Sequence, residues 1–162
     1  MPNLERFIEA QDQPFSGFAD ALAEIRAGGK RGHWIWYVLP NLSGLGSSTM
    51  SQAYAIRDRA EAAEYLRHPV LRARLLLITG AIADRLTGAS PPSLVALMGS
   101  TIDARKLVSS LTLFREVART LAAAPDDEYG RFMATAADVL SAAAAQGYPA
   151  CAHTLAHLRE RV

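Results

Sequence analysis

Apolar residues recur at steps of three and four positions in four segments of this chain, which is the spacing of one buried face of an α-helix. The segments are residues 15–25, 71–82, 107–114 and 129–140. Evidence for strands is thin elsewhere in the sequence. We therefore expect an all-α protein, in which one helix begins at Pro14 and carries Phe15 on its buried face.

The chain has 162 residues, which suits a single helical domain over residues 1–162. A chain of this length buries roughly 70% of its unfolded surface, so it needs no disulfide or metal to fold. The single cysteine, Cys151, excludes an internal disulfide and fits a reducing compartment. No signal peptide and no apolar run long enough to span a bilayer are recognisable. We expect a cytoplasmic protein without membrane contact.

Both tryptophans stand in residues 30–48, KRGHWIWYVLPNLSGLGSS. Basic residues outnumber acidic ones by eight to four over the surrounding residues 24–74. One interpretation is a cationic lip beside aromatic faces, able to hold an anionic or planar ligand. The alternative is a basic loop that leads into a buried aromatic segment. The seven residues HWIWYVL are too few for the spacing of their apolar residues to decide between a helix and a strand. The lip would consist of Lys30, Arg31, His33, Trp34 and Trp36.

A loop rich in glycine and serine follows, and a helix is expected to begin near Ser48. Free N–H groups at the start of a helix, reached through Gly44, Gly46 and Ser47, can attract a phosphate or carboxylate. The loop lacks the lysine and the spacing of a P-loop. It is therefore a candidate anion site without a nucleotide-binding signature.

The segment DARKLVSSLTLF over residues 103–114 predicts a helix with a polar stripe beside its apolar face. Asp103, Lys106 and Ser110 share this stripe and could face a pocket. Alternatively, Asp103 caps the helix and pairs with Lys106, while the serine hydroxyls bond to backbone carbonyls. A serine nucleophile at Ser110, activated by Lys106, is a further possibility for which the sequence shows no oxyanion hole.

Other signals are weak. His153 and His157 are spaced as two ligands on one helix face, but no glutamate or third ligand accompanies them, so we expect no metal. No cofactor is identifiable. The formal net charge of +1 gives no clear signal for nucleic acid. The sequence does not indicate the oligomeric state.

Several strings together resemble one family. They are RFIEAQD (6–12), ALAEIRAGGKRGHWIWYVLP (21–40), GLGSS (44–48), YAI (54–56), EAAEYLRHPVLRARL (61–75) and DARKLVSSLTLF (103–114). The chain is similar over these segments to the bacterial domain-of-unknown-function family 1810, whose members are sometimes mislabelled calpastatin. The resemblance implies a compact, mainly helical fold of about six helices, and it implies no activity.

Our leading hypothesis is a small-ligand protein, with a pocket for an anionic or nucleotide-like ligand between the HWIW segment, the GLGSS loop and the 103–114 helix. The alternatives are a non-enzymatic protein–protein interaction module, with the aromatic segment as core or docking surface, and an enzyme of unknown reaction type. A cavity where Lys30, His33 and Lys106 converge would favour a ligand or catalysis. Buried tryptophans without a cavity would favour the interaction module.

Overall fold

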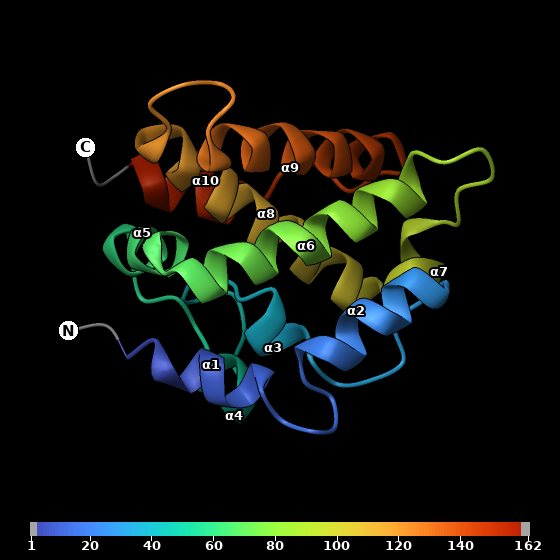
Figure 1. Cartoon of the computed structure of the whole chain (residues 1–162), viewed down its shortest axis with the longest axis horizontal. Coiled ribbons are helices and arrows are strands. Elements are labelled where there is room, and N and C mark those ends of the chain that lie inside the picture. The colour runs from blue at the N-terminus through green and yellow to red at the C-terminus, as the bar shows by residue number, and fades with distance from the viewer. Residues whose placement is uncertain (1–2, 160–162) are drawn as a thin grey trace.

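A computed structural model describes residues 3–159, and this range contains ten helices and no strand (Figure 1). The all-α prediction is confirmed, whereas the expected number of about six helices is wrong. The helices are α1 (Glu5–Gln11), α2 (Phe18–Ala27), α3 (Ile35–Val38), α4 (Thr49–Ala53), α5 (Arg59–Arg67), α6 (Pro69–Leu86), α7 (Leu94–Met98), α8 (Thr101–Leu121), α9 (Glu128–Ala145) and α10 (Ala152–Arg159).

The difference in number arises mainly from short elements. Helices α3, α4 and α7 have only four or five residues, which is about one turn and too short to display a helical period. In addition, the boundary between α5 and α6 falls at a single residue, His68, whose extended backbone precedes Pro69. The His68 imidazole accepts a hydrogen bond from the Val70 N–H and so caps the second of these helices.

Helix α8 occupies the centre of the fold and packs against α9, α5, α7, α10 and α3. The sequence predicts burial of Leu107, Leu111 and Phe114, and all three are buried. The residues between them are buried as well, so residues 107–114 have no solvent-facing side. The helix is therefore a central element, and it reaches the surface only towards its two ends.

Helix α6 packs against α9 and α2, and it crosses the front of the molecule below α9 (Figure 1). The stripe predicted for this helix is buried as expected, through Leu71, Leu75, Ile78 and Ile82. None of the helices within residues 3–159 combines the length and the apolar character that crossing a bilayer requires.

The prediction of a helix from Pro14 is wrong at its first turn. Helix α2 begins at Phe18, and Phe15 is 80% exposed. The cause is local, because Ser16 has a φ of 55°, which lies in the left-handed region and cannot belong to an α-helix. The Ser16 N–H donates to the Asp20 carboxylate at 2.8 Å, and this bond holds the turn against the start of α2.

A buried carboxylate joins α1 to α5. Glu61 is only 2% exposed, and its Oε1 lies 2.9 Å from the Arg6 guanidinium of α1. The same oxygen accepts a hydrogen bond from the Arg57 N–H, while the Asp58 side chain caps α5 by accepting from the Glu61 N–H. In a capping box the Glu61 side chain would also accept from the Asp58 N–H, but here it binds Arg6 and the Arg57 N–H instead.

We expect Glu61→Gln to lower the free energy of unfolding by about 3 kcal/mol, because it removes one partner of a buried ion pair. The matched control is Glu64→Gln, which breaks the exposed Arg67–Glu64 pair on the same helix and should change stability by less than about 1 kcal/mol. Urea denaturation of both variants measures the difference. Equal effects of the two substitutions would contradict a special role for Glu61.

Candidate functional site

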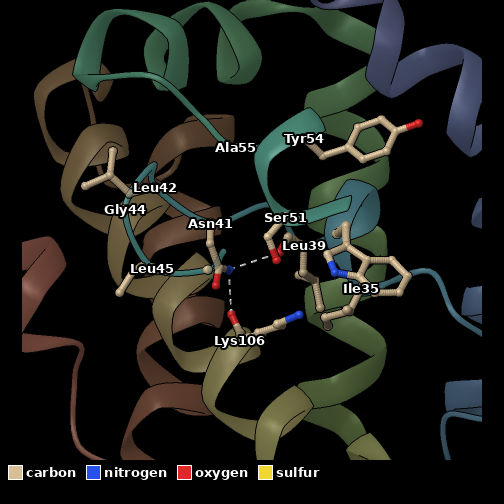
Figure 2. Close-up of a pocket in the computed structure, with 12 residues that line it drawn as sticks. Ile35, Leu39, Asn41, Leu42, Gly44, Leu45, Ser51, Tyr54, Ala55 and Lys106 are labelled. Carbon is tan, nitrogen blue, oxygen red and sulfur yellow. Dashed lines mark hydrogen bonds between the residues drawn. The ribbon is translucent and has the colours of Figure 1, made fainter. Parts of the chain in front are cut away.

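The HWIW segment, the GLGSS loop and α8 meet around one small cavity of about 30 Å³ (Figure 2). Its lining comes from Ile35 and Trp36 of α3, from the loop over residues 39–46, from α4 and the residues that follow it, and from Lys106 of α8. A volume of 30 Å³ holds about two water molecules. Pockets that enclose a whole drug-sized ligand are roughly ten times larger or more.

Lys106 brings a positive charge to this cavity. Its Nζ lies 5.1 Å from the centre of the Trp36 ring, which is within the range of a cation–π contact. Among residues 3–159 it forms no ion pair. Burial lowers the pKa of Lys106 below its usual 10.5, the Asp103 charge partly opposes this effect, and the Lys30 charge adds to it. The ammonium is thus partly desolvated without a bound carboxylate.

The two tryptophans differ in how their indole N–H groups are satisfied. Trp34 is fully buried, and its Nε1 donates to the Glu24 Oε1 at 3.0 Å. Trp36 is only partly buried as a residue, but its Nε1 atom is buried and has no hydrogen-bond partner among the described residues. A buried donor without an acceptor costs about 1–3 kcal/mol. Trp36 lines the cavity, but its Nε1 has almost no accessible surface, so the indole must shift before an acceptor in the cavity can reach it.

Asn41 fixes the loop against α8. Its Nδ2 donates to the Lys106 carbonyl oxygen at 2.9 Å and to the Leu39 carbonyl oxygen at 3.3 Å (Figure 2). The bond to Lys106 joins residues that are 65 positions apart in the sequence. The same residue whose ammonium enters the cavity therefore also anchors the loop that forms the opposite wall.

The glycines of the loop have defined roles. Gly44 has a φ of +96°, a conformation that side chains disfavour. A Cβ on Gly46 would lie 2.6 Å from the Ser51 Oγ, so only glycine allows the loop to approach α4 this closely. The Ser48 side chain caps α4 by accepting from the Ser51 N–H. Ser47, which was predicted to bind an anion with these glycines, is exposed and does not line the cavity.

The predicted cationic lip is divided between the interior and the surface. The Lys30 side chain is 6% exposed, and its Nζ forms an ion pair with Asp103 at 2.7 Å. Asp103 therefore forms its ion pair with Lys30, from another segment, and not with Lys106 on its own helix. Arg31 and His33 are exposed and lie outside the cavity lining, so the anticipated convergence with Lys106 is not formed.

Ser110 is placed in the core, one helical turn beyond Lys106. It is fully buried, it does not line the cavity, and its Oγ has no hydrogen-bond partner within residues 3–159. His153 and His157 stack with ring centres 6.5 Å apart. No cluster of three histidine, cysteine or acidic side chains suited to a metal occurs in the described part of the chain, and the lack of a metal stays a prediction.

Glu24 organises the segment that precedes α3. Its Oε1 accepts hydrogen bonds from the backbone N–H groups of Arg31 at 2.7 Å and Gly32 at 2.8 Å, in addition to the Trp34 indole. Burial would raise the pKa of Glu24, but these hydrogen bonds and the Lys30 charge outweigh it, so the pKa is lowered from 4.5. Sequence reasoning missed Glu24 and Asn41, because nothing in a single sequence marks which backbone groups a side chain binds in the folded chain.

Comparison with known proteins gives a family and a fold. The family model described as "Protein of unknown function (DUF1810)" matches residues 1–140. The crystal structure of the conserved hypothetical protein Rv1873 from Mycobacterium tuberculosis is similar, with a TM-score of 0.72 and 33% sequence identity, covering 98% of this chain and 97% of that chain. No curated protein matches the sequence. These descriptions name no activity or ligand.

We expect Glu24→Gln to lower the free energy of unfolding by about 2 kcal/mol at pH 7, since it weakens hydrogen bonds to a charged acceptor. A carboxyl with a lowered pKa stabilises the fold above its ordinary pKa, and this contribution disappears as the pH falls through the lower, folded value. Wild type and variant should therefore converge in stability below pH 4.5.

Urea denaturation across this pH range measures the effect, with Glu9→Gln on the exposed face of α1 as the control. A difference between wild type and Glu24→Gln that stays constant down to strongly acidic pH would contradict the role of the Glu24 charge.

Proposed function

The chain belongs to the DUF1810 family of proteins of unknown function, and we propose that it binds a small ligand whose anionic group is held between Trp36 and Lys106. The observation that carries this proposal is the buried Trp36 Nε1, a donor without an acceptor. A second donor, the Lys106 ammonium, belongs to a residue that lines the cavity, and it forms no ion pair within residues 3–159. Two such donors call for an acceptor that carries negative charge.

The energetics support an anion more than a neutral acceptor. Burial disfavours the charged form of Lys106, and the charge of Lys30 disfavours it further. A bound anion would reverse this effect, because a nearby negative charge stabilises an ammonium. It would also give the Trp36 N–H a charge-assisted hydrogen bond, which is stronger than one to a neutral group.

The size of the cavity limits what enters it. A volume of 30 Å³ takes the anionic group alone, so the base and sugar of a nucleotide-like ligand would lie outside. The walls beside the two donors are partly apolar, through Ile35, Leu42 and Leu45. A compact anion, or a larger molecule that inserts only its charged end, fits these dimensions.

The interaction module is the second candidate, and the burial of Trp34, Ile35 and Tyr37 favours it. In that case the aromatic segment belongs to the hydrophobic core, and the cavity binds no ligand. The unpartnered N–H of Trp36 argues for the ligand instead, because a purely structural tryptophan would be expected to find an acceptor, as Trp34 does. The catalytic alternative with Ser110 has less support, since Ser110 does not line the cavity.

We expect anions to shift the Trp36 indole N–H signal in two-dimensional ¹⁵N–¹H spectra, because a new hydrogen bond forms there. The Trp34 indole signal should stay in place, because Glu24 already accepts from it. Acetate, formate, phosphate and sulfate are titrated at constant ionic strength with chloride as the reference. Lys106→Met should weaken binding roughly 10- to 100-fold, as expected for a charged hydrogen-bond donor.

The matched control is Arg105→Met, which removes an exposed charge next to Lys106 on α8 and should leave the titration unchanged. If none of these anions moves the Trp36 signal more than chloride does, the proposal is wrong. The proposal is also wrong if Lys106→Met and Arg105→Met change the affinity for anions equally.

The affinity for the anion should also decrease as the pH rises. The anion binds the ammonium form of Lys106, so binding raises the pKa of this group and takes up protons as the pH approaches it. Affinity should therefore fall as the pH rises through a value below 10.5, where free Lys106 loses its proton. Isothermal titration calorimetry in buffers of different ionisation enthalpy measures this uptake. An affinity that is constant through this alkaline range would contradict binding to the ammonium.

A further inference from the structure

We infer that a second copy of this chain docks on the outer face of α6, in a two-fold dimer in which the two α6 helices cross and exchange ends. This face lies apart from the cavity of Trp36 and Lys106, because the two sites share no lining residue. The dimer is therefore independent of the ligand proposed above. Three features support it, namely the pattern of the face, a glycine that the single chain does not require and the charges at the two ends.

The outer face of α6 is apolar and uncovered. The helix lies at the front of the view in Figure 1, between α9 on one side and α2 on the other, and no element of the described chain passes over it. Leu77, near the middle of the helix, is 48% exposed, and Val70 in the first turn is 40% exposed. A groove runs along this face beside Leu77.

The lining of the groove has the pattern of a helix–helix contact. Its α6 residues include two neighbouring rows with a spacing of four, Ala73–Leu77–Ala81 and Leu76–Gly80–Asp84. Rows of this spacing form the ridges that fit between those of a second helix in the commonest packing class, in which the axes cross at about 50°. The first row is tall at its leucine, and the second row is open at its glycine. The face is thus shaped to receive the same face of another copy.

Gly80 is the residue that the single chain does not explain. A glycine inside a helix destabilises it relative to alanine. A Cβ at this position would meet no atom within 4 Å, and the φ of Gly80 is not positive, so neither crowding nor backbone conformation requires glycine. A second α6 supplies the reason, because the partner's Leu77 fits over Gly80. In a two-fold dimer this contact forms twice.

The charges beside the two ends of α6 are opposite. Arg26 of α2 lies beside the last turn, since the neighbouring Ile25 carbonyl oxygen accepts from the Arg85 Nε at 3.1 Å. Glu128 of α9 lies beside the first turns, where its Oε2 accepts from the Arg72 Nε at 2.6 Å. Residues 72 and 85 are about 20 Å apart along the helix axis. The groove therefore has a cation at one end and an anion at the other.

Both end charges can accept a further partner. Arg26 is exposed and forms no ion pair within residues 3–159. The Glu128 side chain is 51% exposed, and the bond to Arg72 uses only one of its two oxygens. An ion pair between these residues in one chain is prevented by the length of helix between them.

One two-fold axis satisfies the centre and the ends together. Residues 77 and 80 are centred on the same point of α6 as residues 72 and 85, so an axis that places Leu77 over the partner's Gly80 also exchanges the two ends. Arg26 and Glu128 flank α6 on opposite sides, and crossed helices bring each of them towards its counterpart on the other copy (Figure 1). A face that carries both members of its own ion pair is complementary to itself. This selects a second copy as the occupant.

The first test is sedimentation equilibrium of the full chain over a range of concentrations. The expected result is a reversible equilibrium between monomer and dimer. A chain that stays monomeric at every soluble concentration would overturn the inference and leave this face to a partner other than a second copy.

Substitutions at the centre test the contact between the helices. Gly80→Leu should raise the dimer dissociation constant about tenfold or more, because its side chain occupies the place of the partner's Leu77. The thermal midpoint of the dilute monomer should not fall, because leucine favours a helix more than glycine does. Leu77→Ser should weaken the dimer similarly, whereas Ile102→Ser, at an exposed apolar residue of α8, should not. A dimer that tolerates both Gly80→Leu and Leu77→Ser overturns the inference.

Mixing two charge variants tests the symmetry. Arg26→Glu and Glu128→Arg should each weaken the dimer, because each places like charges opposite one another at both ends. An equimolar mixture of the two variants should restore it. In the mixed dimer the two substituted residues face each other at one end, and the unchanged Arg26 faces the unchanged Glu128 at the other. Circular dichroism verifies that each variant is folded. A mixture that dimerises no better than the separate variants would contradict the proposed arrangement.

Discussion

The burial of every residue from 107 to 114 is the constraint on which the other elements depend. An α-helix can be enclosed in this way because its backbone groups are paired within the helix. Among the polar side chains of this segment, Thr112 has partners, whereas the Ser110 Oγ has none within residues 3–159. Thr112 donates to the Val108 carbonyl and accepts from the Cys151 N–H, so it joins α8 to the residue that precedes α10. Towards its start the helix leaves the core, and Asp103 and Lys106 stand at this transition.

Near that transition lie two lysines, Lys30 and Lys106, and two tryptophans, Trp34 and Trp36. One member of each pair has an acceptor from the protein and the other has none among the described residues. Lys30 is neutralised by Asp103, and Trp34 is satisfied by Glu24, so both stabilise the loop before α3. Lys106 and Trp36 contact each other without an acceptor from the described chain. The concentration of both tryptophans in one stretch thus has two physical causes. One indole closes the core, and the other forms a wall of the cavity.

Periodicity predicted the long helices because each presents an apolar face over several turns. It left residues 35–38 undecided between helix and strand, because α3 is too short to show a period, and it failed for Phe15, where the backbone of Ser16 excludes a helix. The helix expected near Ser48 is confirmed as α4. Residue types in the sequence were enough to identify the segments that surround the cavity. They could not show which side chains face it. Glu24 binds the backbone N–H groups of residues 31 and 32, and the side chains of Arg31 and His33 stay at the surface.

The most direct measurement of the central claim is a crystal structure of the protein grown in acetate, at a resolution that separates an anion from water. The account predicts one acetate in the cavity, with its oxygens within hydrogen-bond distance of the Trp36 Nε1 and the Lys106 Nζ. A cavity that contains only water, or a Trp36 Nε1 that donates to a protein carbonyl, would contradict it.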